Sequence, residues 1–381
     1  MRIIHVHVHY STELISGENE YVNELDTFFK KDHEVLSYFP KFDRHRIGVF
    51  KAFHIVVSYL TINCKLLKQL NQYDCLVFHN TVPFVSSWTL YLASRIKPVI
   101  KVWHNHRSFC IKGTEFRSGI ECKSCTQSIK GTLVGILSKC YRNSYLQSAI
   151  VTLAEYSNRK FKNTNYLHVV SSKYMYNRVQ EWLGPNVKIQ IIEGVAKPYS
   201  FDKKKVTSCR NDFAFVGRLE FEKGIENLIQ AWKQYQKITN IDSRMHVIGS
   251  GPLLEQLKDL EIPNLIFYGL LSGEEMLKVL KNCKTLFVTS LVKETFGRVA
   301  AEGLLLGMRL VVPPYGAPKE MVIDEDFGQI LNSLSVQCII DALNIENQID
   351  GNLGLTKRIN FAKKYSVNEW ETKWNKFLSQ I

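Results

Sequence analysis

The sequence predicts an α/β protein whose two domains each contain a parallel, doubly wound sheet. Short apolar runs of strand length alternate with helical segments along most of the chain. With 381 residues, the chain is long enough to form two separate cores. Its hydrophobic content of 45% and charged content of 22% are ordinary for a globular protein. In such sheets, ligands bind where the strands end, so the strand ends are where we look for functional residues.

The first domain is expected to span residues 1–195. Gly17 lies at its first strand-to-helix turn, where a glycine lets the backbone approach a phosphate closely. His104 directly follows a predicted strand at 99–103, which favours a ligand contact, with a purely structural histidine as the alternative. Further strands are expected at residues 1–9, 35–39, 73–78, 150–153, 168–170 and 188–192, and helices at 16–29 and 84–94.

The segment Arg44–Leu60 mixes basic and apolar side chains. Arg44, Arg46 and Lys51 lie among isoleucine, valine, phenylalanine and tyrosine residues. Such a pattern is typical of an amphipathic helix on a membrane surface. A core helix with a basic first turn explains the pattern equally well, so both interpretations stay open.

Four of the nine cysteines gather in one segment. Cys110, Cys122, Cys125 and Cys140 follow the spacing C-x11-C-x2-C-x14-C. This pattern indicates a structural zinc site with four thiolate ligands, and packed free thiols are the alternative. The scattered cysteines are expected to be buried as small hydrophobic residues, namely Cys64, Cys75, Cys209 and Cys283.

The second domain, expected at residues 196–365, begins with a candidate phosphate site. A strand at 213–216 ends at Gly217, and a helix follows at 225–232. Arg218 and Lys223 lie in the connection, so a diphosphate there would meet two cations and a helix N-terminus.

A second strand–turn–helix unit lies downstream, at residues 285–306. Glu294 lies in its polar turn, Gly297 precedes the helix, and Glu302 lies inside the helix. Carboxylates suit the hydroxyls of a sugar nucleotide, whereas cations and helix amides suit its phosphates. A surface acid and a helix-face acid with no ligand are the alternative interpretation of this stretch alone.

Together these stretches resemble glycosyltransferase family 4, the retaining sugar-nucleotide transferases of GT-B fold. Arg218 and Lys223 are similar to the family's diphosphate-binding arginine and lysine. The run Glu-Thr-Phe-Gly from Glu294, continued to Glu302, is similar to the family's E-x7-E signature. Between them, residues 247–253 and 267–269 resemble the family's strand-and-glycine turns. The segment 104–140 resembles a branch from bacterial surface-polysaccharide clusters.

The resemblance implies a GT-B fold of two Rossmann-like domains, with a C-terminal helix, residues 366–381, that crosses back to the first. It implies that Glu302 holds the ribose, that Glu294 and His104 contact the donor sugar, and that no metal is needed for catalysis. Phe296, within the signature, and Gly316, in the turn after strand 310–312, would complete the donor pocket.

The distribution of charge indicates where an anionic partner binds. Residues 1–195 contain 25 lysines and arginines against 14 acids, whereas residues 196–381 contain 24 against 22. The sequence contains no recognisable nucleic-acid-binding module or arginine-rich arm, which argues against a nucleic-acid partner. An anionic membrane surface or a diphosphate-linked lipid acceptor fits the basic half better.

We therefore expect a retaining transferase that moves a sugar from a UDP- or GDP-linked donor to a lipid-diphosphate-linked glycan in bacterial surface polysaccharide synthesis, such as O-antigen or capsule. The N-terminal residues have the pattern of a buried strand and not of a signal peptide. A cytoplasmic protein, peripheral on the inner face of the membrane, is expected. The alternative function is a catalytically silent GT-B protein that binds a nucleotide sugar within a membrane assembly.

Overall fold

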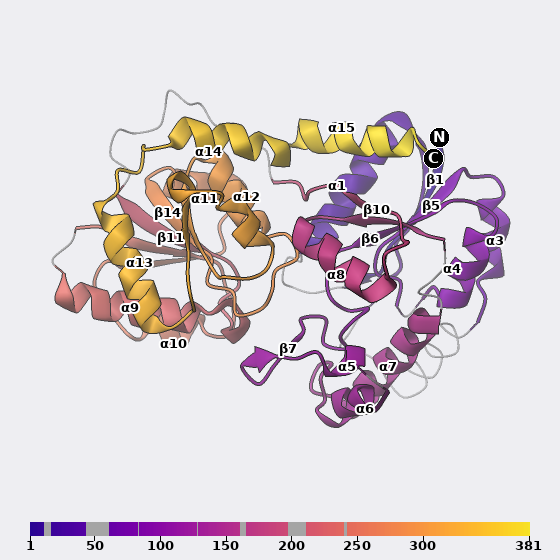
Figure 1. The fold of residues 1–381 in the computed structure, drawn as a ribbon, viewed down its shortest axis with the longest axis horizontal. Helices are drawn as coiled ribbons and strands as arrows, with labels where there is room; N and C mark the ends of the chain where they lie inside the picture. Colours follow the sequence, from indigo (N-terminus) through magenta and orange to yellow (C-terminus); the bar gives the residue numbers. More distant parts are fainter. Residues whose placement is uncertain are drawn as a thin grey trace. The chain divides into compact units, whose positions relative to one another are not determined.

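The computed structural model describes residues 1–10, 17–42, 61–82, 84–127, 129–160, 165–196, 211–239 and 242–381. The chain forms two compact units. The first contains Met1–Ile192 together with Lys373–Ile381, and the second contains Glu193–Thr372. Each unit is a parallel α/β structure (Figure 1), so the predicted fold class is confirmed.

The first unit is built on a six-stranded sheet in the order β10-β9-β6-β5-β1-β3, and every neighbouring pair is parallel. Its strands are β1 (Arg2–Val6), β3 (Glu34–Tyr38), β5 (Cys75–Phe78), β6 (Val99–Trp103), β9 (Leu167–Val170) and β10 (Ile189–Ile191). Two small two-stranded sheets accompany it, formed by β2 (His9–Tyr10) with β4 (Lys41–Phe42) and β7 (Phe116–Arg117) with β8 (Ile120–Glu121). The central strands β1 and β5 are almost completely buried, as expected for a sheet covered on both faces.

The helices of the first unit connect these strands. They are α1 (Gly17–Asp32), α3 (Cys64–Leu70), α4 (Ser87–Ser94), α5 (Ser124–Gln127), α6 (Ile129–Leu137), α7 (Tyr145–Lys160) and α8 (Lys173–Leu183). Several begin at a serine or asparagine that accepts a hydrogen bond from a backbone amide of the first turn; Ser172 accepts one from Met175 N at 3.1 Å before α8.

One predicted strand is wrong. Residues 150–153 lie inside α7 and not in the sheet. The apolar run Ile150–Leu153 belongs to a 16-residue helix whose buried side chains include Val151 and Ala154, three residues apart. A short apolar run has the same composition in a strand and on a buried helix face, so periodicity over four residues could not separate them.

The second unit repeats the architecture with the strand order β13-β12-β11-β14-β15-β16, again with every neighbouring pair parallel. The strands are β11 (Asp212–Val216), β12 (Met245–Ile248), β13 (Leu265–Gly269), β14 (Cys283–Phe287), β15 (Arg309–Val312) and β16 (Gly328–Ile330). The helices are α9 (Ile225–Ile238), α10 (Leu254–Lys258), α11 (Gly273–Leu280), α12 (Arg298–Leu305), α13 (Val336–Gln348) and α14 (Leu355–Ala362). Short 3-10 turns occur at Phe221–Lys223, Ala317–Met321, Glu325–Phe327 and Lys363–Tyr365.

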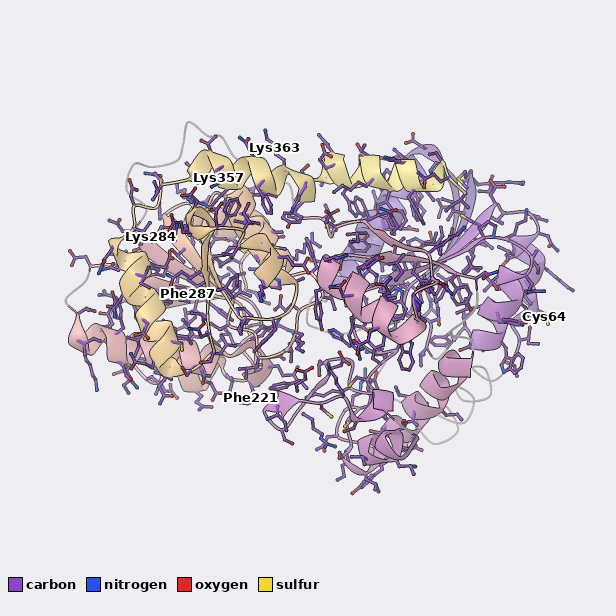
Figure 2. All side chains as sticks on the ribbon, in the orientation of Figure 1. Cys64, Phe221, Lys284, Phe287, Lys357 and Lys363 are labelled. Carbon is purple, nitrogen blue, oxygen red and sulfur yellow. The ribbon has the colours of Figure 1, made fainter. Side chains whose placement is uncertain are left out.

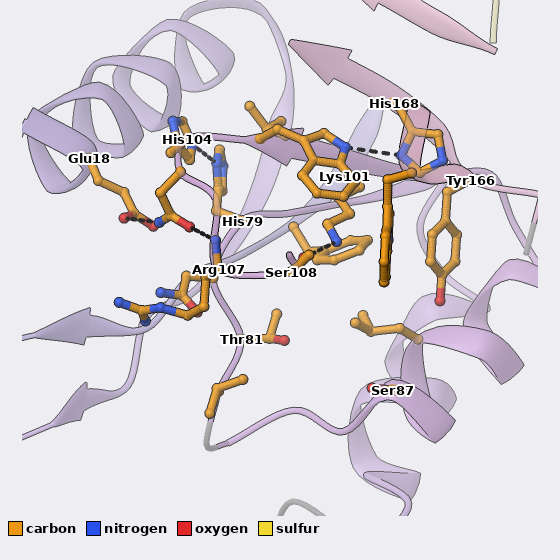
Figure 3. Close-up of a pocket in the computed structure, with 18 of the residues that line it drawn as sticks. Glu18, His79, Thr81, Ser87, Lys101, His104, Arg107, Ser108, Tyr166 and His168 are labelled. Carbon is orange, nitrogen blue, oxygen red and sulfur yellow. Dashed lines mark hydrogen bonds between the residues drawn. The ribbon is translucent and has the colours of Figure 1, made fainter. Parts of the chain in front are cut away.

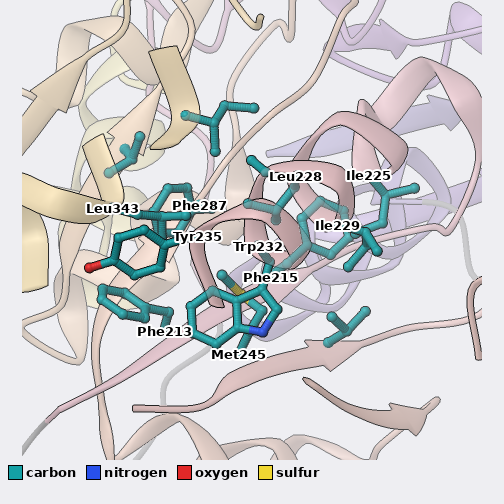
Figure 4. Close-up of a cluster of buried hydrophobic side chains, with 14 of the residues drawn as sticks. Phe213, Phe215, Ile225, Leu228, Ile229, Trp232, Tyr235, Met245, Phe287 and Leu343 are labelled. Atoms are coloured by element: carbon teal, nitrogen blue, oxygen red, sulfur yellow. The ribbon is translucent and has the colours of Figure 1, made fainter. Parts of the chain in front are cut away.

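Alternation along β11 produces two cores on opposite faces of this sheet. Phe213 and Phe215 pack with Trp232 of α9 and with apolar residues of α13 (Figure 4). Ala214, between them, faces the other cluster, which includes residues of α12 and α14. Successive side chains of a strand point to opposite faces, so one five-residue strand contributes to both layers.

The C-terminal helix α15 (Val367–Leu378) begins in the second unit and ends in the first. Its Trp374 is fully buried, stacks edge-on against Phe29 with ring centroids 5.6 Å apart, and donates a hydrogen bond from Nε1 to the Tyr21 hydroxyl at 3.3 Å. Both partners belong to α1. The predicted return of this helix to the first unit is therefore confirmed.

The scattered cysteines were expected to be buried. Cys75 and Cys283 are buried as predicted, but Cys64 is exposed at the start of α3 (Figure 2), so that expectation was wrong for Cys64. Cys338, which the sequence expectations omitted, is half-buried. The segment Arg44–Leu60 and Cys209 lie outside the described residues.

Replacing Trp374 by alanine should remove the main anchor of α15 on α1. We expect Trp374→Ala to lower the free energy of unfolding by about 3–5 kcal/mol, because a large buried ring is lost and leaves a cavity. Urea denaturation followed by circular dichroism measures this loss. Trp88→Ala is the control, since Trp88 is 42% exposed and its loss should cost far less. Equal losses in the two variants would contradict the anchoring role.

Candidate functional site

The second unit brings two predicted site loops together where β11 and β14 end. These strands are parallel neighbours, so their carboxyl ends meet at the same sheet edge. The loop after β11 forms a single 3-10 turn that ends at Gly224, whose φ is +64°. A side chain at Gly224 would place its Cβ 2.1 Å from the carbonyl oxygen of Thr289, so only glycine permits this approach. The Thr289 hydroxyl in turn donates to the carbonyl oxygen of Lys223 at 2.9 Å.

The two loops are joined by an ion pair. Lys223 Nζ donates to Glu294 Oε1 at 2.6 Å, and the two side chains are 24% and 18% exposed. Burial acts to raise the pKa of Glu294, but the charge and hydrogen bond of Lys223 outweigh it and hold that pKa below its usual value, with smaller help from Ser290 and Arg218. Glu294 is therefore a carboxylate, held in place by a cation from the neighbouring loop.

Two glycines with positive φ let the chain pass close to Glu294. A Cβ at Gly316 (φ +76°) would lie 3.0 Å from the Glu294 backbone nitrogen and 3.2 Å from its oxygen. That oxygen also accepts a hydrogen bond from Ala317 N at 2.9 Å. Gly297 (φ +82°) caps the N-terminus of α12, and a Cβ there would lie 2.6 Å from Pro318 Cγ. Glu294 thus lies between two turns that only glycine can form.

The two remaining charged residues predicted for this site are Glu302 and Arg218. Glu302 is buried on α12 and accepts a hydrogen bond from Arg298 Nε at 3.2 Å. Arg218 is half-exposed and pairs with Glu220 at 2.8 Å, so its guanidinium lies at the surface of the loop. An exposed pair of this kind contributes little stability, which leaves Arg218 able to exchange its partner for an anion.

Phe296 lies on the inner side of its loop. Its ring packs edge-on against Tyr365 with centroids 5.6 Å apart, and a Cβ at Gly194 would lie 2.4 Å from the ring. The structure therefore places Phe296 in the packing between the 294–297 loop and the start and end of this unit.

In the first unit, Gly17 begins α1, and a Cβ there would meet nothing within 4 Å. His104 follows β6 and lines an open pocket with about 830 Å³ of empty space, part of it continuous with solvent (Figure 3). Burial lowers the pKa of His104 to about 4, although the nearby Glu18 carboxylate acts to raise it. His104 is therefore neutral at neutral pH.

Sequence reasoning missed most of this pocket. Its wall combines polar groups with aromatic rings, among them Phe78, Lys101, Trp103, Tyr166, His168 and Trp182. Lys101 Nζ lies 3.7 Å from the centre of the Trp103 ring and donates to Ser108 Oγ at 3.0 Å. Phe78, Lys101, Trp103 and His168 belong to β5, β6 and β9, Tyr166 directly precedes β9, and Trp182 belongs to α8. The available signal was that polar and aromatic residues follow several neighbouring strands of one sheet.

The four cysteines of residues 110–140 are all described. A hydrogen bond from Cys125 lowers the pKa of Cys110 to about 6 and raises that of Cys125, so these two thiols are neighbours. Cys140 packs beside Cys125 in a small apolar cluster with Ile111. Within the described residues, no group of three or more His, Cys, Asp and Glu side chains is arranged to hold a metal ion. The structural zinc site stays a prediction.

The chain is similar to known glycosyltransferases. Residues 197–346 match the family model described as Glycosyl transferases group 1. An uncharacterized glycosyltransferase of Methanocaldococcus jannaschii, MJ1178, is 29% identical over 222 residues, which cover 56% of this chain and 58% of the relative. The chain spans about half the length of the curated relatives it matches.

Solved structures match over the whole chain. Anabaena HepE in complex with UDP and glucose has a TM-score of 0.64 at 16% identity, with 100% of both chains covered. The lipopolysaccharide outer core galactosyltransferase WaaB has a TM-score of 0.63 at 13% identity, also with 100% of both chains covered. The fold is GT-B. At these identities the likeness to solved structures concerns the fold.

Gly316→Ala should lower the stability of the protein more than the matched substitution Gly269→Ala. Gly316 combines φ +76° with ψ −179°, a region that side chains avoid, and its Cβ would press on the Glu294 backbone. We expect a loss of about 1–3 kcal/mol in unfolding free energy, measured by urea denaturation.

Gly269→Ala is the control for this prediction. Gly269 has φ +69°, and a Cβ there would meet nothing within 4 Å, so this variant carries a backbone cost without the contact. Equal destabilisation of both variants would mean that the space around Glu294 is not the constraint.

Proposed function

We propose that the chain is a retaining glycosyltransferase that moves a sugar from a nucleotide-sugar donor, UDP- or GDP-linked, to a lipid-diphosphate-linked glycan in bacterial surface polysaccharide synthesis. The match of residues 197–346 to group 1 glycosyl transferases supports the activity. The fold neighbours solved with UDP and glucose support a nucleotide-sugar donor. WaaB, named for the lipopolysaccharide outer core, supports a role in bacterial surface polysaccharide synthesis.

The observation that carries the proposal is the ion pair between Lys223 and Glu294. A carboxylate for sugar hydroxyls and a cation for phosphate lie 2.6 Å apart at the sheet edge where such folds bind ligands. In the proposed reaction, Lys223 and Arg218 neutralise the diphosphate as it leaves, which lowers the barrier as negative charge develops there. Glu294 holds the donor sugar and Glu302 the ribose, while Gly297 opens the N-terminus of α12 to the phosphates.

The proposed membrane association is supported by a surface of the first unit around α6. Leu133, Leu137 and Leu146 are 54%, 72% and 57% exposed on α6 and α7. The surrounding residues 107–146 contain seven lysines and arginines against two glutamates. Exposed apolar side chains in a basic field match an anionic bilayer surface, to which each basic residue contributes about 1 kcal/mol. No described helix is long and apolar enough to cross a bilayer.

Removing either donor-site cation should abolish most of the transfer activity. We expect Lys223→Ala and Arg218→Ala each to lower kcat/KM for transfer by a factor on the order of 10² or more, because charge stabilisation of the leaving diphosphate is lost. Radiolabelled UDP- or GDP-sugars, presented with a membrane extract as the acceptor source, measure transfer.

Lys258→Ala is the matched control, since Lys258 also forms an ion pair, with Glu255 at 3.2 Å, in the same unit. Its activity should equal that of the unchanged protein. Near-normal turnover in both site variants would remove the donor-site assignment. Nucleotide-sugar binding without any transfer would instead support a catalytically silent binding protein.

The apolar residues of α6 should contribute to membrane binding. We expect Leu133→Ser combined with Leu137→Ser to reduce co-sedimentation of the full chain with vesicles that contain anionic phospholipid. Added salt should also release the unchanged protein, because ions screen charges beyond roughly 10 Å. The control variant, Ile238→Ser with Leu270→Ser, removes side chains of similar exposure, 67% and 61%, from the second unit. Equal loss in both variants would contradict a specific role for α6.

A further inference from the structure

Three buried side chains of the first unit and the partly exposed His104 form a continuous hydrogen-bonded chain. His5 Nδ1 lies 3.0 Å from Asp26 Oδ1, and His5 Nε2 lies 2.7 Å from His79 Nε2. His79 Nδ1 lies 2.6 Å from His104 Nε2 (Figure 3). His5 is on β1, His79 follows β5 and His104 follows β6, and these strands are neighbours in the sheet. We call these four residues the histidine relay.

One end of the relay is a carboxylate. Burial acts to raise the pKa of Asp26, but hydrogen bonds from His5, Lys30 and Ser37 hold it well below its usual value. Lys30 Nζ donates to Asp26 Oδ2, and Ser37 Oγ donates to Oδ1, each at 2.6 Å. An ionised carboxylate is only an acceptor, so His5 must donate its Nδ1 proton to Asp26.

The three histidines are neutral at neutral pH. Burial lowers the pKa of His5 in spite of Asp26, and burial with the charges of neighbouring histidines holds the pKa of His79 well below its usual value. Burial lowers the pKa of His104 to about 4. A neutral imidazole carries one proton, so one ring nitrogen donates and the other accepts.

The carboxylate therefore determines every proton position along the relay. His5 uses its single proton toward Asp26, so its Nε2 accepts from His79 Nε2–H. His79 Nδ1 then accepts from His104 Nε2–H. The relay ends at His104 Nδ1, which carries no proton and is a hydrogen-bond acceptor.

Other charged and titratable groups surround the relay. From α1, the charge of Glu18 raises the pKa of His104, and the charge of Lys30 lowers the pKa of His5. His7, just after β1, lowers the pKa of all three histidines, and His9 lowers the pKa of His79. Arg107 lowers the pKa of Glu18 and of His7. Tyr21 of α1 packs edge-on against the His104 ring with centroids 4.9 Å apart. The Glu18 carboxylate alone raises the pKa of His104, and burial outweighs it.

The pocket that His104 lines contains both acceptors and donors. Glu18 Oε1 is buried and accepts no hydrogen bond. Trp103 Nε1 donates to His168 Nδ1 at 3.1 Å, so neutral His168 carries its proton on Nε2, which is buried and lacks a partner. Asn80 Nδ2 is a further buried donor without a partner. A carbohydrate hydroxyl both donates and accepts, which suits this mixture, whereas a phosphate offers only acceptors.

We propose that Asp26, His5 and His79 are positioning residues that hold His104 in the tautomer whose Nδ1 accepts a hydrogen bond from a carbohydrate hydroxyl. The proton arrangement is a property of the folded protein alone. The assignment of the hydroxyl to a sugar substrate rests on the proposed function. His104 contacts the substrate, and the other three act through it.

The tautomers are measured by ¹⁵N NMR of histidine-labelled full-length protein at neutral pH, with His104 assigned by its loss in His104→Gln. We expect His104 to be protonated at Nε2 and unprotonated at Nδ1. In Asp26→Asn, the amide oxygen should face Lys30 and the amide group should donate to His5 Nδ1, which reverses all three histidines and moves the proton of His104 to Nδ1.

Ser37→Ala is the matched control, because it removes a hydrogen bond to the same Asp26 oxygen but keeps the carboxylate. It should leave the His104 tautomer unchanged. His246, which pairs with Asp212 at 2.9 Å in the second unit, is an internal reference in every spectrum. A His104 protonated at Nδ1 in the unchanged protein would overturn the proposal, even if Asp26→Asn failed to fold. An Asp26→Asn variant that folds and keeps the original tautomer would overturn it too.

Activity provides an independent readout. Asp26→Asn should lower kcat/KM for transfer about 10- to 100-fold, as expected when a substrate hydroxyl loses its buried acceptor, and should leave UDP binding unchanged. Full transfer activity in a variant with reversed tautomers would overturn the role toward substrate. If the tautomers are as stated but no nucleotide sugar supports transfer, the proposed function fails while the relay geometry stands.

Discussion

The contact between Lys223 and Glu294 is the interaction on which the candidate site of the second unit depends. It joins loops that follow two neighbouring strands, and close backbone approaches at two glycines accompany it. Gly224 lets one loop touch Thr289, and Gly316 lets another turn lie against the Glu294 backbone. Partly removing two charges from water is costly, and each charge compensates for the burial of the other.

The two candidate sites hold their polar groups by different physical means. The site in the second unit relies on opposite charges at close range, in the pair of Lys223 and Glu294. The first unit contains a relay of neutral histidine rings with a carboxylate at one end. There the positions of the protons, and not a net charge, determine which ring nitrogens donate and which accept hydrogen bonds. A neutral, directional arrangement suits the recognition of hydroxyls, whose donors and acceptors differ by the position of a single hydrogen.

The sequence predicted much of the fold, and the proximity of two of its candidate site residues, because those features are local. In one motif a strand, a cation and a helix follow one another closely, and in the other a strand, an acid, a glycine and a helix do so. Because the two strands are neighbours in the sheet, Lys223 and Glu294 come within hydrogen-bond distance. The histidine relay is different, since His5, His79 and His104 become neighbours only through the strand order β6-β5-β1, and Asp26 reaches His5 from α1. The strand predicted at 150–153 failed because a four-residue apolar run carries no period that distinguishes strand from helix. Cys64 is exposed because it is the first residue of α3, where the helix face is not yet buried.

The position of Trp374 has a consequence for how the first unit is made. Trp374 and Tyr21 are 353 residues apart in the chain, and closing a loop of that length costs about 5 kcal/mol of conformational entropy. On the ribosome, α1 emerges early, but the side chains that cover Tyr21 and Phe29 are synthesised only after the entire second unit. Throughout that interval, an aromatic face of α1 stays open to water and to other apolar surfaces. The first unit is thus completed last, and its yield in the cell depends on how well this face is shielded until α15 arrives.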